Sequence, residues 1–192
     1  MKILTITSLL YRHPLERNYT TFVLMKLMNF AVTLCFIPLL FVTKTSWGQD
    51  DIAKVLRSWN KETVPYIHPE HISDTDSIAY LDTREKEEYD VSHLQNAIWV
   101  GYKKFDEKYI LERIPDKSQP IIVYCSIGVR SENIGEKLKK LGYTKVLNLH
   151  GGIFEWKNKG GQVFNDQETL TDSVHAFSKH WGRFLHNGIK VY

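Results

Sequence analysis

The sequence predicts an α/β fold with a mainly parallel central sheet flanked by helices. From residue 64 to residue 160, short runs rich in β-branched and aromatic residues alternate with amphipathic segments of helical spacing. Residues 121–124 (IIVY) are continuously apolar, which is typical of a parallel strand that is buried on both faces. Regular alternation of this kind favours a single sheet of parallel strands with helices packed on it.

The expected elements follow one another in order along this stretch. Strands are expected over residues 64–67, 77–82, 97–100, 121–124 and 145–149. Helices are expected over residues 84–89, 105–114 and 131–141, and a last helical turn over residues 151–160. Gly142 is a helix stop signal directly after the third of these helices.

Two flanking segments lie outside the alternation. Residues 49–65 form an expected helical lead-in, whose apolar residues recur at helical spacing: Ile52, Val55, Leu56 and Trp59. Residues 165–192 form an expected C-terminal helical extension with an aromatic stripe: Val174, Phe177, Trp181 and Phe184. We expect the second helix to pack on the body of the domain, and a partner-binding helix is the alternative.

The balance of charge argues against a nucleic-acid partner. Hydrophobic residues make up 43% of the chain and charged residues 24%, which is typical of a globular protein. The formal net charge of +3 comes from the N-terminus, because residues 1–48 hold five basic residues and one acid. The rest of the chain has 20 basic and 21 acidic residues, so no basic surface for nucleic acid is expected.

The N-terminus has the layout of a secretory signal. Residues 30–42 (FAVTLCFIPLLFV) carry no charge, Lys26 precedes them, and the small residues Ser46 and Gly48 follow. We therefore expect residues 1–48 to be a signal peptide that is cleaved before Gln49, with export to the periplasm. Residues 25–48 alone have a normal signal length, so the start is either Met1 or Met25.

An uncleaved membrane anchor over residues 22–42 is the alternative interpretation of this segment. If the signal is cleaved, no membrane association remains and Cys35 leaves with the signal. Cys125 is then the one cysteine of the mature chain. An odd cysteine in an exported protein indicates either intermolecular pairing or a reactive thiol.

The segment around Cys125 has the features of a site for a nucleophilic thiolate. Cys125 follows a predicted buried strand, and Ser131 is expected to cap the next helix, with Glu132 in its first turn. In open α/β sheets, sites form beyond the carboxyl ends of strands. Gly128 permits a tight loop of inward N–H groups, and Arg130 adds a positive charge that lowers a thiol pKa. The alternative is that Cys125 is a small buried apolar side chain.

Three motifs then resemble those of single-domain rhodaneses. Residues 125–131 (CSIGVRS) resemble the C-x-x-G-x-R-S active-site loop of that family. Residues 80–100 (YLDTREKEEYDVSHLQNAIWV) resemble its Asp-x-Arg strand and the later Gly-His-Ile-x-Gly-Ala stretch, although Ser92 and Asn96 replace the two glycines of that stretch. Residues 149–160 (LHGGIFEWKNKG) resemble its closing Gly-Gly-x-x-x-Trp motif. The resemblance implies a rhodanese-like domain over residues 66–164.

The resemblance also implies sulfur transfer. Cys125 would take a sulfane sulfur from thiosulfate or a persulfide and pass it to cyanide or a thiol, including a thiol on a partner protein. The residues implied in substrate binding are those of the loop: Ser126, Ile127, Gly128, Val129, Arg130 and Ser131. Asp82 and Arg84 are implied to be a structural ion pair near the site, and His93 a packed histidine.

Other functions fit less well. Related phosphatases place five residues between cysteine and arginine, whereas four separate Cys125 from Arg130. A non-catalytic module that binds or carries sulfur stays open as an alternative. A disulfide oxidoreductase is disfavoured, because the chain has no C-x-x-C motif. No metal-binding or cofactor motif is recognisable, so we expect neither a metal nor a cofactor.

Overall fold

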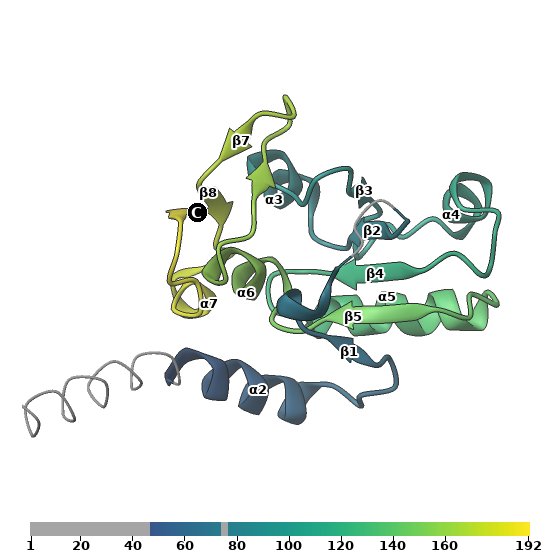
Figure 1. The fold of residues 1–192 in the computed structure, drawn as a ribbon, viewed down its shortest axis with the longest axis horizontal. Helices are drawn as coiled ribbons and strands as arrows, with labels where there is room; N and C mark the ends of the chain where they lie inside the picture. Colours follow the sequence, from purple (N-terminus) through teal and green to yellow (C-terminus); the bar gives the residue numbers. More distant parts are fainter. Residues whose placement is uncertain (1–46, 74–76) are drawn as a thin grey trace, which may run out of the picture. The chain divides into compact units, whose positions relative to one another are not determined.

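The computed structural model describes residues 47–73 and 77–192 (Figure 1). The expected signal peptide and both candidate starts lie outside these residues, apart from the last two positions of the signal. Among the described residues, no helix combines the length and the apolar character needed to cross a membrane.

A five-stranded sheet has the order β1-β5-β4-β2-β3, and every neighbouring pair of its strands is parallel. The strands are β1 (Tyr66–Ile67), β2 (Ala79–Asp82), β3 (Ile98–Trp99), β4 (Ile121–Tyr124) and β5 (Val146–Leu149). The predicted α/β class and mainly parallel sheet are therefore confirmed. Because β4 is the central strand, its carboxyl end is flanked by loops from both neighbouring strands.

Helices connect the strands and cover the sheet. They are α2 (Trp47–Trp59), the short 3₁₀ helix η2 (Pro69–His71), α3 (Lys86–Val91), α4 (Glu107–Arg113), α5 (Val129–Lys140), α6 (Gly152–Asn158) and α7 (Lys179–Gly182). Each helix predicted between residues 84 and 160 is present, with shifted ends. The lead-in predicted over residues 49–65 holds all of α2 except its first two residues, and Ile52 and Leu56 of this helix are both buried.

Alternate residues of β4 face two separate hydrophobic clusters. Ile122 and Tyr124 belong to the cluster that contains residues of α2 and α6. Ile121 and Val123 belong to the other cluster, with residues of α4 and α5. Successive side chains of a strand point to opposite faces of the sheet, so a continuously apolar strand buries both faces. Helices therefore cover the sheet on two sides.

The prediction of a helical C-terminal extension is wrong. The segment contains β7 (Leu170–Thr171), which pairs antiparallel with β6 (Val163–Phe164), and β8 (Ser173–His175), which pairs with β9 (Ile189–Val191). Only the four-residue α7 is helical. Phe177 has a φ of 62° and interrupts any continuous helix, and Ser178 caps α7 by accepting a hydrogen bond from the Trp181 N–H.

The expected packing of this segment on the domain is nevertheless confirmed. Val174 and Phe184 are buried in the same cluster as α6, although one lies in a strand and the other beyond a short helix. Their spacing matches a helical period because two separate elements return to the same core. Phe177 is exposed and Trp181 is only partly buried. Both side chains line a pocket together with Cys125.

The turn between β5 and α6 has room only for a glycine at position 152. Gly152 has a φ of 54°, and a Cβ atom there would lie 2.2 Å from the carbonyl oxygen of Cys125. The N–H groups of Ile153 and Phe154 donate to the carbonyls of Cys125 and Ser126, at 2.9 and 3.1 Å. The start of α6 therefore holds the backbone of the Cys125 loop directly.

We expect Gly152→Ala to lower the free energy of unfolding by about 3 kcal/mol, because it adds a backbone clash to the strain of a positive φ. Gly160→Ala is the matched control, since Gly160 also has a positive φ of 86° but meets nothing within 4 Å. It should cost only the strain, about 1–2 kcal/mol. Urea denaturation of both variants measures the difference, and equal losses would contradict the assigned clash.

Candidate active site

Cys125 is the first residue after β4, and its side chain is buried, with 2% exposure. The N–H of Gly128 donates a hydrogen bond to the Cys125 Sγ at 3.1 Å, and the Ser131 Oγ lies 3.6 Å from the same sulfur. Gly128 has a φ of 109°, which lets the loop curl back on the sulfur. The loop therefore surrounds the thiol with hydrogen-bond donors.

Ser131 does not cap α5, and that prediction is wrong. The helix begins at Val129, with Gly128 in the N-cap position. The Ser131 hydroxyl faces the sulfur and also donates to the Asn148 Oδ1 at 2.7 Å, while the Asn148 amide donates to the carbonyl of Gly128 at 2.9 Å. Ser131 is thus the third residue of α5 rather than its cap, and its hydroxyl positions the Cys125 loop.

Glu132 lies in the first turn of α5, as expected, but it also ties the helix to the segment before β1. Its Oε1 accepts from the N–H groups of Lys61 and Thr63, at 3.0 and 3.1 Å. This contact joins the active-site helix to the chain that follows α2. The contact therefore fixes the position of α5 relative to residues 61–63, the segment between α2 and β1.

Arg130 forms a buried ion pair with Glu88 of α3. Its Nη1 and Nη2 donate to the two carboxylate oxygens of Glu88 at 2.7 and 2.8 Å, and Nη2 also donates to the Ser126 Oγ at 2.9 Å. The side chain of Glu88 is 2% exposed and that of Arg130 is 19% exposed. Bidentate geometry fixes the guanidinium in one orientation beside the cysteine.

The pKa of Cys125 is lowered from its ordinary value. Burial acts in the opposite direction, because it disfavours the charged thiolate. The positive charge of Arg130 and the hydrogen bonds from Ser131 and Gly128 outweigh burial. The pKa of Glu88 is likewise lowered, because Arg130 and Arg84 outweigh the effect of its burial. The surroundings of Cys125 thus stabilise its thiolate more than water stabilises that of a free cysteine.

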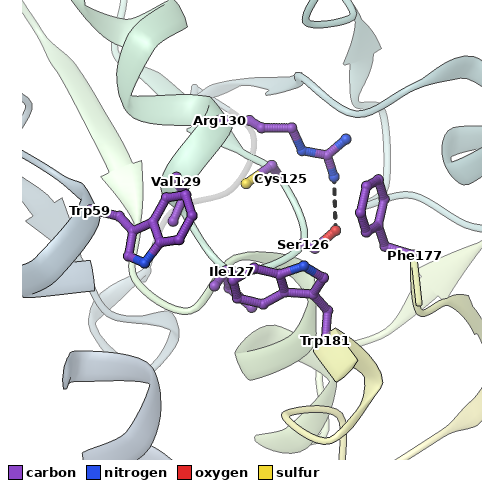
Figure 2. A pocket seen from close by; sticks show the side chains of 8 residues that line it. All are labelled: Trp59, Cys125, Ser126, Ile127, Val129, Arg130, Phe177 and Trp181. Carbon is purple, nitrogen blue, oxygen red and sulfur yellow. Dashed lines mark hydrogen bonds between the residues drawn. The ribbon is translucent and has the colours of Figure 1, made fainter. Parts of the chain in front are cut away.

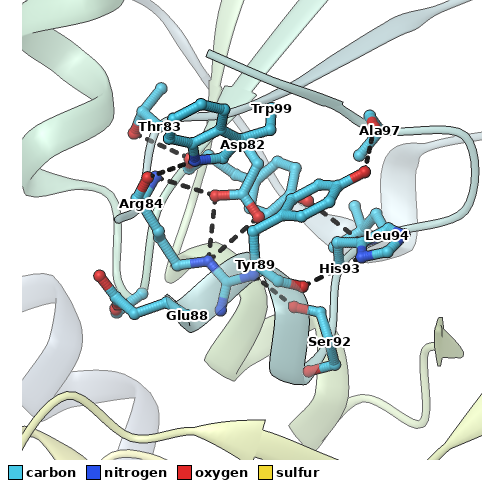
Figure 3. Close-up of polar contacts among 12 residues, drawn as sticks. Asp82, Thr83, Arg84, Glu88, Tyr89, Ser92, His93, Leu94, Ala97 and Trp99 are labelled. Carbon is cyan, nitrogen blue, oxygen red and sulfur yellow. Dashed lines mark hydrogen bonds and ion pairs between the residues drawn. The ribbon is translucent and has the colours of Figure 1, made fainter. Parts of the chain in front are cut away.

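Asp82 and Arg84 lie beside this network as an ion pair whose side chains are both fully buried (Figure 3). The Arg84 Nη2 donates to the Asp82 Oδ2 at 2.6 Å and to the carbonyl of Ser92 at 2.5 Å. The pair therefore fastens the loop after β2 to the end of α3, the helix that carries Glu88. Neither residue hydrogen-bonds to the Cys125 sulfur, in agreement with a structural role.

His93 is packed and hydrogen-bonded, as expected. Its ring stacks on Tyr89 at 3.9 Å between centroids, Nδ1 lies 3.1 Å from the Tyr89 carbonyl, and Nε2 lies 3.2 Å from the Glu168 carboxylate. Figure 3 shows these two rings beside the Asp82–Arg84 pair. His93 therefore belongs to the frame of the site.

A pocket of about 190 Å³ opens over Cys125 (Figure 2). Its polar lining comes from Ser126 and Arg130. The other lining residues are apolar, and they come from the loop and from the two flanking segments: Trp59, Ile127, Val129, Phe177 and Trp181. The sulfur is thus approached through a largely apolar opening.

Comparison with known proteins identifies the family. Residues 69–159 match the rhodanese-like domain family. Thiosulfate sulfurtransferase GlpE of Coxiella burnetii is 31% identical over 80 residues, which is 42% of this chain and 72% of that protein. The chain belongs to the rhodanese-like family. The resemblance of the three sequence motifs is thereby confirmed for the rhodanese domain.

Two further matches cover about a quarter of the other protein's length. The tRNA uridine(34) hydroxylase of Enterobacter sp. is 32% identical over 91 residues, which is 46% of this chain and 26% of that protein. The crystal structure of thiosulfate sulfurtransferase from Pseudomonas aeruginosa has a TM-score of 0.50 and 20% identity, covering 72% of this chain and 26% of that one. The second comparison supports the fold. The family match and the two sequence relatives support a sulfur-transfer family generally.

The structure brings most of the predicted site residues together. Cys125, Ser126, Ile127, Val129 and Arg130 line the pocket, while the Gly128 N–H and the Ser131 hydroxyl face the sulfur from the loop and the helix. The sequence analysis missed five residues at the site: Trp59, Glu88, Asn148, Phe177 and Trp181. No local signal separates Glu88 from its neighbours Glu85 and Glu87, because the distinction lies in tertiary contacts.

We expect Ser131→Ala to raise the pKa of Cys125, since it removes a hydrogen-bond donor from the thiolate and loosens Asn148. The rate of alkylation by iodoacetamide at pH 7 should fall about three- to tenfold, and its midpoint should move to higher pH. Ser118→Ala is the matched control, because Ser118 lies in the turn before β4 and donates to Asp116. An unchanged alkylation profile for Ser131→Ala would refute this role.

We expect Glu88→Gln to lower the free energy of unfolding at pH 7 by about 2 kcal/mol, because it removes one charge of a buried pair. The folded-state pKa of Glu88 lies below its unfolded value. Its contribution is therefore present above pH 4.5, the ordinary value for glutamate, and is lost as the pH falls through the lower folded pKa.

The difference between wild type and Glu88→Gln should accordingly shrink between pH 7 and pH 3, as measured by urea denaturation. Glu112→Gln is the control, since Glu112 is an exposed residue of α4. A difference that stayed constant with pH would show that Glu88 does not contribute through its charge.

Proposed function

We propose that this chain is a sulfurtransferase in which Cys125 carries sulfane sulfur as a persulfide. The donor is thiosulfate or a persulfide, and the acceptor is a thiol or, in an assay, cyanide. The observation that carries the proposal is the buried Cys125 sulfur held by the N–H of Gly128 beside the charge of Arg130. This setting favours a thiolate nucleophile and an anionic product.

The reaction consists of two transfers in this proposal. The Cys125 thiolate attacks the outer sulfur of the donor, a new S–S bond forms, and the donor's S–S bond breaks with its electron pair leaving on sulfite or a thiolate. An acceptor thiolate then attacks the terminal sulfur of the persulfide and releases Cys125. The loop N–H groups stabilise the negative sulfur in both states.

The persulfide is expected to sit within the loop that surrounds Cys125. A sulfur atom added to Sγ extends toward the pocket, where Ser126 and Arg130 supply the polar lining. Arg130 already donates to Glu88 and Ser126, so its role is to hold charge beside the sulfur. These hydrogen bonds of Arg130 also disfavour a phosphatase, because a phosphatase needs an arginine that is free to bind a phosphoryl dianion.

A carrier without turnover would use the same persulfide. It differs from an enzyme in the second transfer, which needs an acceptor to reach the sulfur. We also propose that the chain is exported, because of the basic, apolar and small-residue order of residues 1–48. In that compartment the acceptor would be a small thiol or a cysteine of a partner protein.

We expect thiosulfate to add the mass of one sulfur atom to the full chain and cyanide to remove it, as measured by intact mass spectrometry. Peptide mapping should locate the added sulfur on Cys125. Cys125→Ser should abolish the gain, whereas Cys35→Ser should retain it, because Cys35 lies in the expected signal. No mass gain on a thiol shown to be free and reactive would contradict transfer from thiosulfate.

Release of thiocyanate over many cycles separates an enzyme from a carrier. Turnover with thiosulfate and cyanide is expected, while a single stoichiometric release would indicate a sulfur-binding module. Hydrolysis of an aryl phosphate by wild type but not by Cys125→Ser would instead support a phosphatase.

A further inference from the structure

Three aromatic side chains surround the opening above Cys125, and none belongs to the matched family segment. Trp59 is the last residue of α2, Phe177 precedes α7, and Trp181 lies within α7. We call these three residues the aromatic collar. The rings of Trp59 and Trp181 meet edge to face, with 6.3 Å between centroids (Figure 2). The two flanking segments therefore build the walls of the pocket.

The collar exposes apolar surface at the site. Trp59 is 67% exposed and Phe177 is 52% exposed, although residues close by in the sequence, Leu56 and Ala176, are buried. Phe177 also has a φ of 62°, a strained conformation that residues other than glycine rarely adopt. Exposed aromatic rings beside a nucleophile, one of them on a strained backbone, point to a ligand that covers them.

The charges of the pocket disfavour a small dianion. The positive charge of Arg130 is paired with Glu88, and the ring of Phe177 lies 5.2 Å from the guanidinium carbon. A Cys125 thiolate then adds a negative charge to an already neutral pair. A donor with one negative charge and an apolar group meets less repulsion here than a doubly charged one such as thiosulfate.

The size of the pocket fits a single ring. Its volume is about 190 Å³, and an apolar cavity of about 150 Å³ is known to hold benzene. Edge-to-face contact with Trp59 or Trp181 would suit an aromatic group. The sulfur of such a ligand would lie at the base of the pocket, next to Cys125.

We propose that the collar selects a singly charged organic sulfur donor whose apolar group, of about the size of one aromatic ring, is attached next to the S–S bond. This inference rests on the proposed sulfurtransferase function and names its donor class. With an aryl thiosulfonate, the Cys125 thiolate attacks the outer sulfur and forms a persulfide anion. The bond between that sulfur and the sulfonyl sulfur breaks, and an aryl sulfinate leaves with the electron pair, so charge and atoms balance.

The test compares benzenethiosulfonate with methanethiosulfonate, because the two donors share charge and reacting atoms and differ in the ring. Persulfide formation on the full chain is followed by intact mass, and each rate is divided by that of a small free thiol with the same donor. Wild type should favour benzenethiosulfonate by about tenfold or more, since burying a ring in place of a methyl group adds apolar contact area. Thiosulfate serves as the dianionic comparison and should load more slowly than benzenethiosulfonate.

The variants then test the collar itself. The double variant Trp59→Ala with Phe177→Ala removes two exposed side chains, and the normalised preference for the ring should fall at least threefold. Tyr109→Ala is the matched control, because Tyr109 is an exposed aromatic residue of α4 outside the pocket, and it should keep the preference. Circular dichroism and thermal unfolding establish that each variant is folded.

The outcomes separate this inference from the proposed function. If wild type loads sulfur with both thiosulfonates at equal normalised rates, or if the double variant keeps the full preference, the collar does not select the donor and sulfur transfer still stands. If none of the three donors loads a Cys125 thiol shown to be reactive, transfer from thiosulfate in the proposed function fails, and the inference fails with it.

Discussion

The loop after β4 has to direct backbone N–H groups toward one sulfur atom, and most of the site follows from this constraint. Gly128 supplies the positive φ that turns the loop, and its N–H donates to the Cys125 sulfur. The carbonyls of Cys125 and Ser126 then accept hydrogen bonds from the first N–H groups of α6. That contact requires Gly152, because any side chain there would collide with the Cys125 carbonyl. Gly128 and Gly152, which lie in two different turns, thus both support the conformation of the Cys125 loop.

Electrostatics explains why residues of β2 and α3, outside the Cys125 loop, also belong to the site. A buried thiolate needs a positive charge nearby, and a buried arginine in turn needs a carboxylate. Arg130 obtains one from Glu88 of α3, and the Asp82–Arg84 pair holds the ends of α3 and β2 together. Charge therefore alternates through the site: Glu88 fixes Arg130, and the nearby positive charge of Arg84 also favours the ionised Glu88. The thiolate is the member of this chain that remains open to chemistry.

The sequence predicts what depends on local pattern. Strand β4 was recognisable from its continuous apolar run, and the Cys125 loop from its residues and its place after that strand. Ser131 was assigned to a cap because serine before a helical segment usually has that role, yet tertiary contacts with Cys125 and Asn148 take its hydroxyl. The helix predicted over residues 165–192 is wrong for a related reason, because tertiary contacts produce the pattern there as well. Residues of two elements that return to one core can imitate a helical period, and Phe177 breaks the helix at a position whose residue type gives no warning.

The collar shows how flanking segments can change a site whose chemistry they do not supply. The matched family segment contains Cys125, Arg130 and the glycine turns, the residues on which the proposed sulfur transfer depends. Helix α2 and the C-terminal segment are anchored by buried residues such as Leu56 and Phe184, and each then presents an aromatic ring over Cys125. These aromatic side chains line the pocket but form no hydrogen bond with the Cys125 sulfur. Other residues at the three positions would therefore change the shape of the pocket without removing the groups that stabilise the thiolate. Donor selection and sulfur chemistry are in this way assigned to different parts of one chain.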